Sequence, residues 1–259
     1  MKLFWSAASF AAALTLASCG GGGGADTKAE LPKTPEATGP AAVPDEANGA
    51  TITGKVTFSG AKPPVRKLDM SAVPSCERTH PDGQPSEEVV INKNGTVKYA
   101  FVWIKSGLPN QRWQVPTAAV TLDQKGCMYQ PHVLAVMTGQ TIAMVNSDST
   151  NHNIHPTPAV NQEWNESQPP GSGVRSQSFP KQELLLPIKC NIHPWMRAYV
   201  NVIAHPFFAV TGDDGSFTIK GLPPGTYTIE VVHEKYGAQE QQITVGAKES
   251  KTADFTIKG

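Results

Sequence analysis

The sequence predicts an all-β protein, because short alternating segments are frequent and helical patterns are rare. Glycine and proline contribute 23 and 22 of the 259 residues, and this load of turn formers favours short strands over long helices. No window keeps an apolar period of 3.6 residues, whereas many short segments alternate between apolar and polar side chains. Strands separated by turn signals are typical of a β-sandwich or a barrel.

Residues 1–18 have the pattern of an export signal. Met1-Lys2 is followed by an apolar run over residues 3–16 that is too short for a permanent membrane span. Residues 16–19 read Leu-Ala-Ser-Cys, which resembles a bacterial lipoprotein cleavage box. This resemblance implies cleavage before Cys19 and lipidation of Cys19. The alternative is an ordinary signal peptide cut nearby, in which Cys19 has no role. We expect an exported, lipid-anchored protein facing the periplasm or the cell surface.

Residues 19–49 are predicted to form a disordered tether behind this anchor. They begin with five consecutive glycines after Cys19 and then carry four prolines among small and charged residues. Such a composition cannot bury a hydrophobic core. We expect this segment to hold the folded part away from the membrane.

Ten segments beyond residue 50 are predicted strands, since they alternate and are rich in β-branched or aromatic residues. The turn signals Asn94-Gly95 and Asp214-Gly215 separate some of them. The predicted strands cover residues 51–58, 97–104, 120–122, 141–145, 183–186, 199–203, 216–219, 227–232, 242–245 and 253–257.

Residues 210–231 contain an Asp-Gly hairpin, a Pro-Pro-Gly turn and an alternating strand. This stretch resembles the carboxypeptidase regulatory-like (transthyretin-like) β-sandwich. Gly54-Lys55-Val56 and Ala100-Phe101-Val102 fit the strands with which that family begins. The resemblance implies a sandwich formed by residues 50–112 and 206–259, with a second domain at residues 113–205 nested between them. Two domains in tandem, or one fused sheet, are the alternatives.

The inserted segment holds a set of soft-metal ligands. His152 precedes a short loop in which Cys190, His193 and Met196 follow one another at intervals of three residues. One thiolate, two imidazoles and one thioether form the ligand set of a blue-copper centre, in which the thioether is a weak axial ligand. Each residue taken alone would more often be a core or surface residue, and only the combined spacing points to copper.

Residues 118–204 resemble a cupredoxin of the plastocyanin and amicyanin kind. The loop spacing and the His-Asn-Ile-His stretch at residues 152–155 match amicyanin, and Gly139-Gln140-Thr141 followed by Asn146 matches the strand before the first ligand. The resemblance implies a Greek-key sandwich, a single type 1 copper, and a hydrogen bond from Asn153 to the ligand loop. One departure is that residues 186–189 lack the aromatic residue that many cupredoxins have before the cysteine.

Cys76 and Cys127 are the two remaining cysteines of an exported chain, so a disulfide is the expected state. The alternative is a second metal site, because His80 follows Cys76 and His132 follows Cys127 at short spacing. No role is predicted for the other three histidines, which are His155, His205 and His233.

We expect an electron carrier that exchanges single electrons with redox proteins such as c-type cytochromes. His193 is expected to face the partner at an exposed edge that Trp195 helps to shape. An enzyme is not expected, because all four coordination positions are taken by the protein. Lysine plus arginine and aspartate plus glutamate number 22 each, and zero net charge argues against nucleic-acid binding. The alternatives are a copper-storage lipoprotein without redox turnover and a surface adhesion or carbohydrate-binding module.

Overall fold

The computed structural model describes residues 39–259. The predicted signal peptide, the lipidation site Cys19 and residues 19–38 of the predicted tether lie outside this range. The last part of the predicted tether is not disordered, because Ala42 pairs with Trp113 and exchanges backbone hydrogen bonds with Arg112 and Gln114. Between residues 39 and 259, no helix is both long and apolar enough to cross a membrane.

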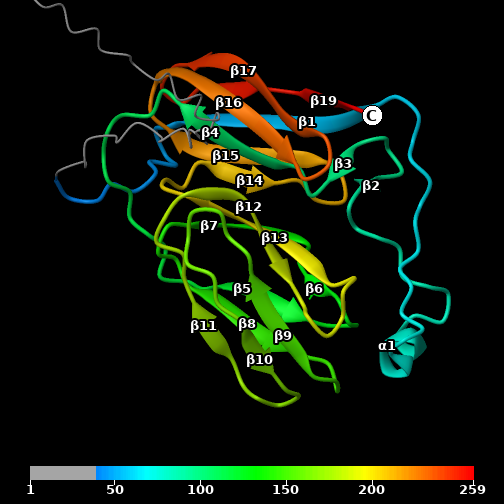
Figure 1. Ribbon diagram of the computed structural model, residues 1–259. Coiled ribbons are helices and arrows are strands. Elements are labelled where there is room, and N and C mark those ends of the chain that lie inside the picture. Colours follow the sequence, from blue (N-terminus) through cyan, green and yellow to red (C-terminus); the bar gives the residue numbers. More distant parts are fainter. Residues whose placement is uncertain (1–38) are drawn as a thin grey trace, which may run out of the picture. The chain divides into compact units, whose positions relative to one another are not determined.

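The predicted all-β class is confirmed, and the strands form two sandwiches (Figure 1). The first sandwich combines strands from the beginning and the end of the described chain. One of its sheets has the order β15-β1-β18, with β19 also paired to β1, and the other has the order β14-β4-β16-β17. The strands are β1 (Ala50–Ser59), β4 (Phe101–Ser106), β14 (Phe208–Val210), β15 (Ser216–Leu222), β16 (Gly225–His233), β17 (Gly237–Val245), β18 (Ser250–Thr252) and β19 (Phe255–Lys258).

A short hairpin of β2 (Val90–Ile91) and β3 (Val97–Lys98) precedes β4. Tyr99 has a φ of 66° and separates β3 from β4, so the single strand predicted over residues 97–104 is interrupted there. The alternation along β16 places Tyr227, Ile229 and Val231 inside the first sandwich, where they are buried. This core is continuous with side chains from β1, β15 and β19.

The second sandwich is built from the middle of the chain. Its sheets have the orders β10-β9-β12-β13-β7 and β11-β8-β5-β6. The strands are β5 (Val120–Gln124), β6 (Tyr129–Gln130), β7 (Val133–Met137), β8 (Ile142–Asn146), β9 (His152–Pro156), β10 (Glu166–Gln168), β11 (Arg175–Gln177), β12 (Glu183–Lys189) and β13 (Arg197–Ile203). Both parallel pairs, β5 with β8 and β7 with β13, are joined by long connections rather than hairpins.

The segment from residue 60 to residue 89, which we call the cap segment, leaves the first sandwich after β1 and reaches the second. It contains α1 (Pro74–Thr79), the one helix among residues 39–259. Met70 and Cys76 of the cap segment are buried in the same apolar cluster as the core of the second sandwich. The cap segment therefore adds a covering layer that the second sandwich does not supply from its own strands.

A smaller apolar cluster joins the two sandwiches, and we call it the intersandwich cluster. Its buried members are Phe101 and Trp103 of β4, Ile203 of β13 and Val232 of β16. Side chains of β7, β12 and β14 pack around them.

Candidate metal centre

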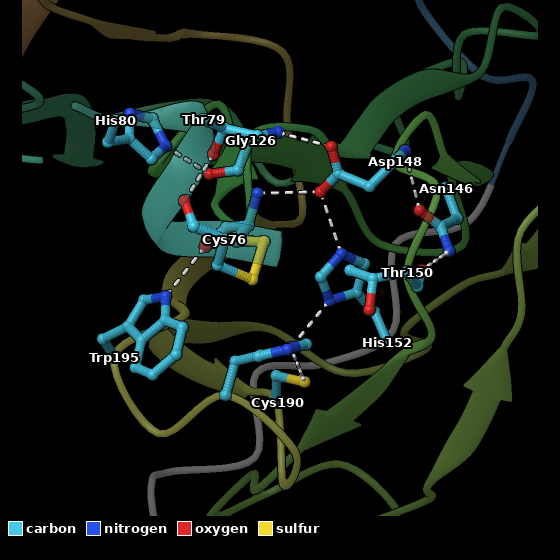
Figure 2. Close-up of a disulfide and its surroundings, with 12 residues drawn as sticks. Cys76, Thr79, His80, Gly126, Asn146, Asp148, Thr150, His152, Cys190 and Trp195 are labelled. Carbon is cyan, nitrogen blue, oxygen red and sulfur yellow. Dashed lines mark hydrogen bonds and ion pairs between the residues drawn. A yellow bond between two sulfur atoms is a disulfide. The ribbon is translucent and has the colours of Figure 1, made fainter. Parts of the chain in front are cut away.

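Three of the four predicted ligands meet at one end of the second sandwich. His152 is the first residue of β9, Cys190 directly follows β12, and His193 lies in the turn that leads to β13. One donor atom from each of the three lies within 4.8 Å of the other two. Nδ1 of His152 is 2.9 Å from Nδ1 of His193, and the latter nitrogen is 3.6 Å from Sγ of Cys190. Figure 2 shows His152 and Cys190 on facing sides of this cluster.

The turn at residues 190–196, which we call the ligand turn, is closed by its own backbone hydrogen bonds. The amide of Met196 donates to the carbonyl of His193 at 2.9 Å, and the amide of Cys190 donates to the carbonyl of Met196 at 3.2 Å. Met196 is fully buried and belongs to the same apolar cluster as Cys190. The turn thus places the fourth predicted ligand beside Cys190 and His193, inside the core.

The candidate centre is enclosed, which corrects the expected exposure of His193. His152 is completely buried, His193 is 1% exposed and Cys190 is 2% exposed. The prediction of an exposed His193 edge came from the ligand loop alone and is wrong, because the disulfide of the cap segment lies against this imidazole. Trp195 is partly buried, and its ring centroid is 5.3 Å from that of His193.

Asp148 positions His152 and was missed by the sequence reasoning. Its Oδ2 atom accepts a hydrogen bond from Nε2 of His152 at 2.9 Å (Figure 2). A metal-binding histidine commonly donates its other ring nitrogen to a carboxylate, which fixes the ring and its tautomer. The signal was present, because Asp148 is the only acidic residue between Asp123 and Glu163.

Asn153 holds the ligand turn from the neighbouring strand. Its Oδ1 atom accepts from the amide of Asn191 at 2.7 Å and lies 3.3 Å from Sγ of Cys190, so the hydrogen bond that the resemblance implied is present. Tyr129 is fully buried and donates from its hydroxyl to the carbonyl of Asn153 at 2.5 Å. The strand before Cys190 lacks an aromatic residue, but its Leu186 is fully buried and fills the same core.

The electrostatics of the centre favour the metal-binding protonation states of Cys190 and His193, but not that of His152. Burial raises the pKa of the Cys190 thiol, but hydrogen bonds from the His152 side chain and from backbone amides outweigh it, and the pKa is lowered. Burial and the neighbouring His152 lower the pKa of His193 to about 4, so its imidazole is neutral at pH 7. Burial lowers the pKa of His152, but bonds to Asp148 and Cys190 outweigh it and the pKa is raised.

The donor set fits a soft first-row ion. In a trigonal plane with metal–nitrogen bonds of about 2.0 Å and a metal–sulfur bond of about 2.3 Å, donors lie roughly 3.5 to 3.7 Å apart. The sulfur–nitrogen distance of 3.6 Å falls in this range, and the nitrogen–nitrogen distance of 2.9 Å is somewhat shorter. Cys190, His152 and His193 would hold the ion, and Met196 is the fourth candidate ligand.

Cys76 and Cys127 form a disulfide. Their sulfurs are bonded to each other, so the alternative metal site of these cysteines with His80 and His132 is wrong. His80 instead lies 2.7 Å from the carbonyl of Gly126 through Nε2. Nδ1 of His132 donates to the carbonyl of Arg197, and its Nε2 pairs with Glu234.

The remaining histidines lie apart from the donor cluster. His155 hydrogen-bonds to Asn191 and Glu163. His205 and His233 are buried, and each accepts a backbone amide through Nδ1.

A cavity of about 520 Å³ lies beside the ligand turn. Pro194 and Trp195 of the turn line it together with Arg197 and Tyr199 of β13, and residues 66–69 and 86–88 of the cap segment form another wall. Trp195 therefore borders both the cavity and His193.

Comparison with known proteins shows a match to one family model and similarity to several solved structures. The sequence model of the carboxypeptidase regulatory-like domain matches residues 194–258, which confirms the resemblance expected for the end of the chain. No curated protein matches the chain.

Similar solved structures include cupredoxins. A methionine-to-alanine variant of amicyanin with Cu(I) is 25% identical, with 39% of this chain and 97% of that chain covered and a TM-score of 0.30. A purple cupredoxin from Nitrosopumilus maritimus is 21% identical, with 32% and 98% covered and a TM-score of 0.27. A copper-containing nitrite reductase from Thermus scotoductus is 22% identical, with 38% and 25% covered and a TM-score of 0.29. These TM-scores are low, so the case for copper rests on this chain's own donor atoms.

Proposed function

We propose that this protein is an electron carrier with one type 1 copper ion held by His152, Cys190, His193 and Met196. The observation that carries the proposal is the convergence of two imidazole nitrogens and one thiol sulfur within 4.8 Å, in a buried end of a β-sandwich. When bound, copper supplies a one-electron Cu(I)/Cu(II) couple, and thiolate, imidazole and thioether ligands suit it.

The residues around the donors prepare them for this role. Asp148 fixes the ring of His152, the neutral imidazole of His193 has a lone pair to offer, and the lowered pKa of Cys190 favours its thiolate. His152, His193 and Cys190 are buried, so water is kept away from their donor atoms. Since protein groups fill all the ligand positions, the centre suits an electron carrier and not an enzyme.

Because His193 is buried, we propose that electrons pass through Trp195 to a redox protein docked at the cavity, such as a c-type cytochrome. The chain would be exported and anchored through lipidated Cys19, with no nucleic-acid partner. Its domains would be nested, with residues 50–112 and 206–259 forming the regulatory-like domain around a cupredoxin domain at residues 113–205.

Titration of the purified protein with cupric ion tests the proposal. We expect one equivalent to bind and to produce an intense visible absorption. The Cys190→Ser variant should lose this absorption, because the colour arises from the thiolate–copper bond. The Met196→Leu variant should keep its copper but show a higher reduction potential, because removing the thioether favours Cu(I).

His155→Asn is the matched control, since His155 lies near the ligand turn but outside the donor cluster. This variant should keep the colour of the wild type. Retained blue colour in Cys190→Ser would contradict the ligand assignment. A reversible electrode potential and electron exchange with a cytochrome separate the carrier from a copper-storage protein.

A further inference from the structure

We propose that the Cys76–Cys127 disulfide positions both histidine ligands, so that its redox state tunes the copper centre. This inference deepens the proposed function and rests on it for its role, although its geometric basis can be tested without copper. The disulfide belongs to the turn between β5 and β6 on one side and to α1 of the cap segment on the other.

The turn holds His152 through one carboxylate. The amides of Gly126 and Cys127 each donate to Asp148 at 2.7 Å, and Asp148 in turn accepts from Nε2 of His152 at 2.9 Å (Figure 2). Successive amides that point at one anion form a compact binding concavity. Any shift of this turn therefore moves the carboxylate that orients the His152 ring.

The same turn reaches His193 from the other side. The carbonyl of Cys127 accepts from Nε1 of Trp195 at 3.0 Å, and the Trp195 ring packs against His193. Both disulfide sulfurs also lie within 4.8 Å of a ring nitrogen of His193. One residue, Cys127, thus supports both imidazoles, through its amide and through its carbonyl and sulfur.

The backbone conformation of Cys127 has to be stabilised by its surroundings. Its φ of 54° is in the left-handed region, which is unfavourable for a residue with a Cβ and persists where the surroundings enforce it. The disulfide to Cys76 is the covalent part of that enforcement, and both cysteines are at most 2% exposed. The hydrogen bond between His80 and Gly126 is a weaker link from the cap segment to the turn.

Reduction would remove the covalent hold. The reductant would be the dithiol of another exported protein, which supplies two electrons and two protons. The sulfur–sulfur bond between Cys76 and Cys127 becomes two thiols, and the reductant is oxidised to a disulfide. Cys127 is then free to leave the left-handed conformation, and Asp148 and Trp195 lose a common anchor. We expect the two imidazoles to be held less firmly and His193 to become more accessible.

The test compares the full chain with its Cys76→Ser/Cys127→Ser variant, both loaded with copper. We expect the variant to bind one copper but to show a displaced visible band, a changed reduction potential and at least tenfold faster copper loss to a chelator. Asp148→Asn should reproduce the changes to a smaller extent. The amide side chain has only one oxygen to accept from the two backbone amides of the turn and from His152. Arg78→Ala, on an exposed part of α1, is the matched control and should match the wild type.

A copper-free readout separates this inference from the proposed function. The imidazole NMR signals of His152 and His193 should shift in the metal-free double variant and stay unchanged in Arg78→Ala. Unchanged imidazole signals in a folded double variant would overturn the positioning role, whether or not the protein binds copper. If the double variant does not fold, reduction of the wild type with a water-soluble phosphine, which is oxidised to its oxide, gives the same comparison.

Discussion

His205 is a buried imidazole that makes the stability of the fold depend on pH. Burial lowers its pKa to about 4, although Nε2 is hydrogen-bonded to the carbonyl of Ile104 at 2.9 Å. The unfolded chain has a histidine pKa of about 6.5. As the pH falls below this value, His205 becomes protonated in the unfolded state but stays neutral in the folded state. The unfolding free energy therefore decreases between about pH 6.5 and pH 4.

The His205→Gln variant should lose this part of the pH dependence. Urea unfolding at pH 7 and at pH 4 should show a difference in unfolding free energy that is smaller than in the wild type by up to about 3 kcal/mol. His193, whose pKa is also about 4, remains in both proteins and its effect cancels in the comparison. An equal pH dependence in the two proteins would mean that His205 is not a buried neutral group.

At the scale of elements, β1 depends on a glycine in the middle of its length. A Cβ at Gly54 would lie 2.1 Å from the carbonyl oxygen of Ala253 and 2.7 Å from the ring of Phe217. Both contacts are far too short, and the carbonyl belongs to backbone that cannot rotate away. The Gly-Lys-Val pattern that suggested the family resemblance thus has a steric cause in the first sandwich.

Gly54→Ala should therefore destabilise the protein by about 1–3 kcal/mol or more, as overpacked sites do. Gly212→Ala is the matched control, because no atom lies within 4 Å of its Cβ position and its φ is not in the left-handed region. Denaturant unfolding of both variants measures the difference. Equal stability of the two variants would show that β1 can shift to admit the methyl group.

The strands that sequence reasoning found are those with a buried, alternating face. β1, β15 and β16 match their predicted ranges to within a few residues. β10 and β11 were missed, because they are three residues long, polar and at sheet edges, where no apolar face is required. β9 was read only as a ligand segment, since His152-Asn153 shows no apolar alternation at its start.

At the scale of the whole molecule, the donor residues could be predicted from the sequence, but the residues that bury and position them could not. Cys190, His193 and Met196 share one turn, so their proximity follows from local spacing. The burial of His193 and the contacts of Asp148 depend on the cap segment and on the turn at Cys127. This cysteine is 21 residues from Asp148 and 68 residues from Trp195, and it contacts both. Such contacts leave no periodic signal, and only tertiary structure reveals them.

The two sandwiches are also expected to unfold together, because they share the intersandwich cluster. A substitution at Ile203 measures the strength of this coupling. This side chain of β13 is fully buried in the intersandwich cluster against aromatic residues of β4. Ile203→Ala should lower the unfolding free energy by about 2–5 kcal/mol, because the cavity lies between two sheets that cannot both close on it. Val160→Ala, whose side chain is 44% exposed, is the control and should change stability little. Calorimetry should show a lower midpoint for both sandwiches together, whereas a shift confined to one transition would mean that they unfold independently.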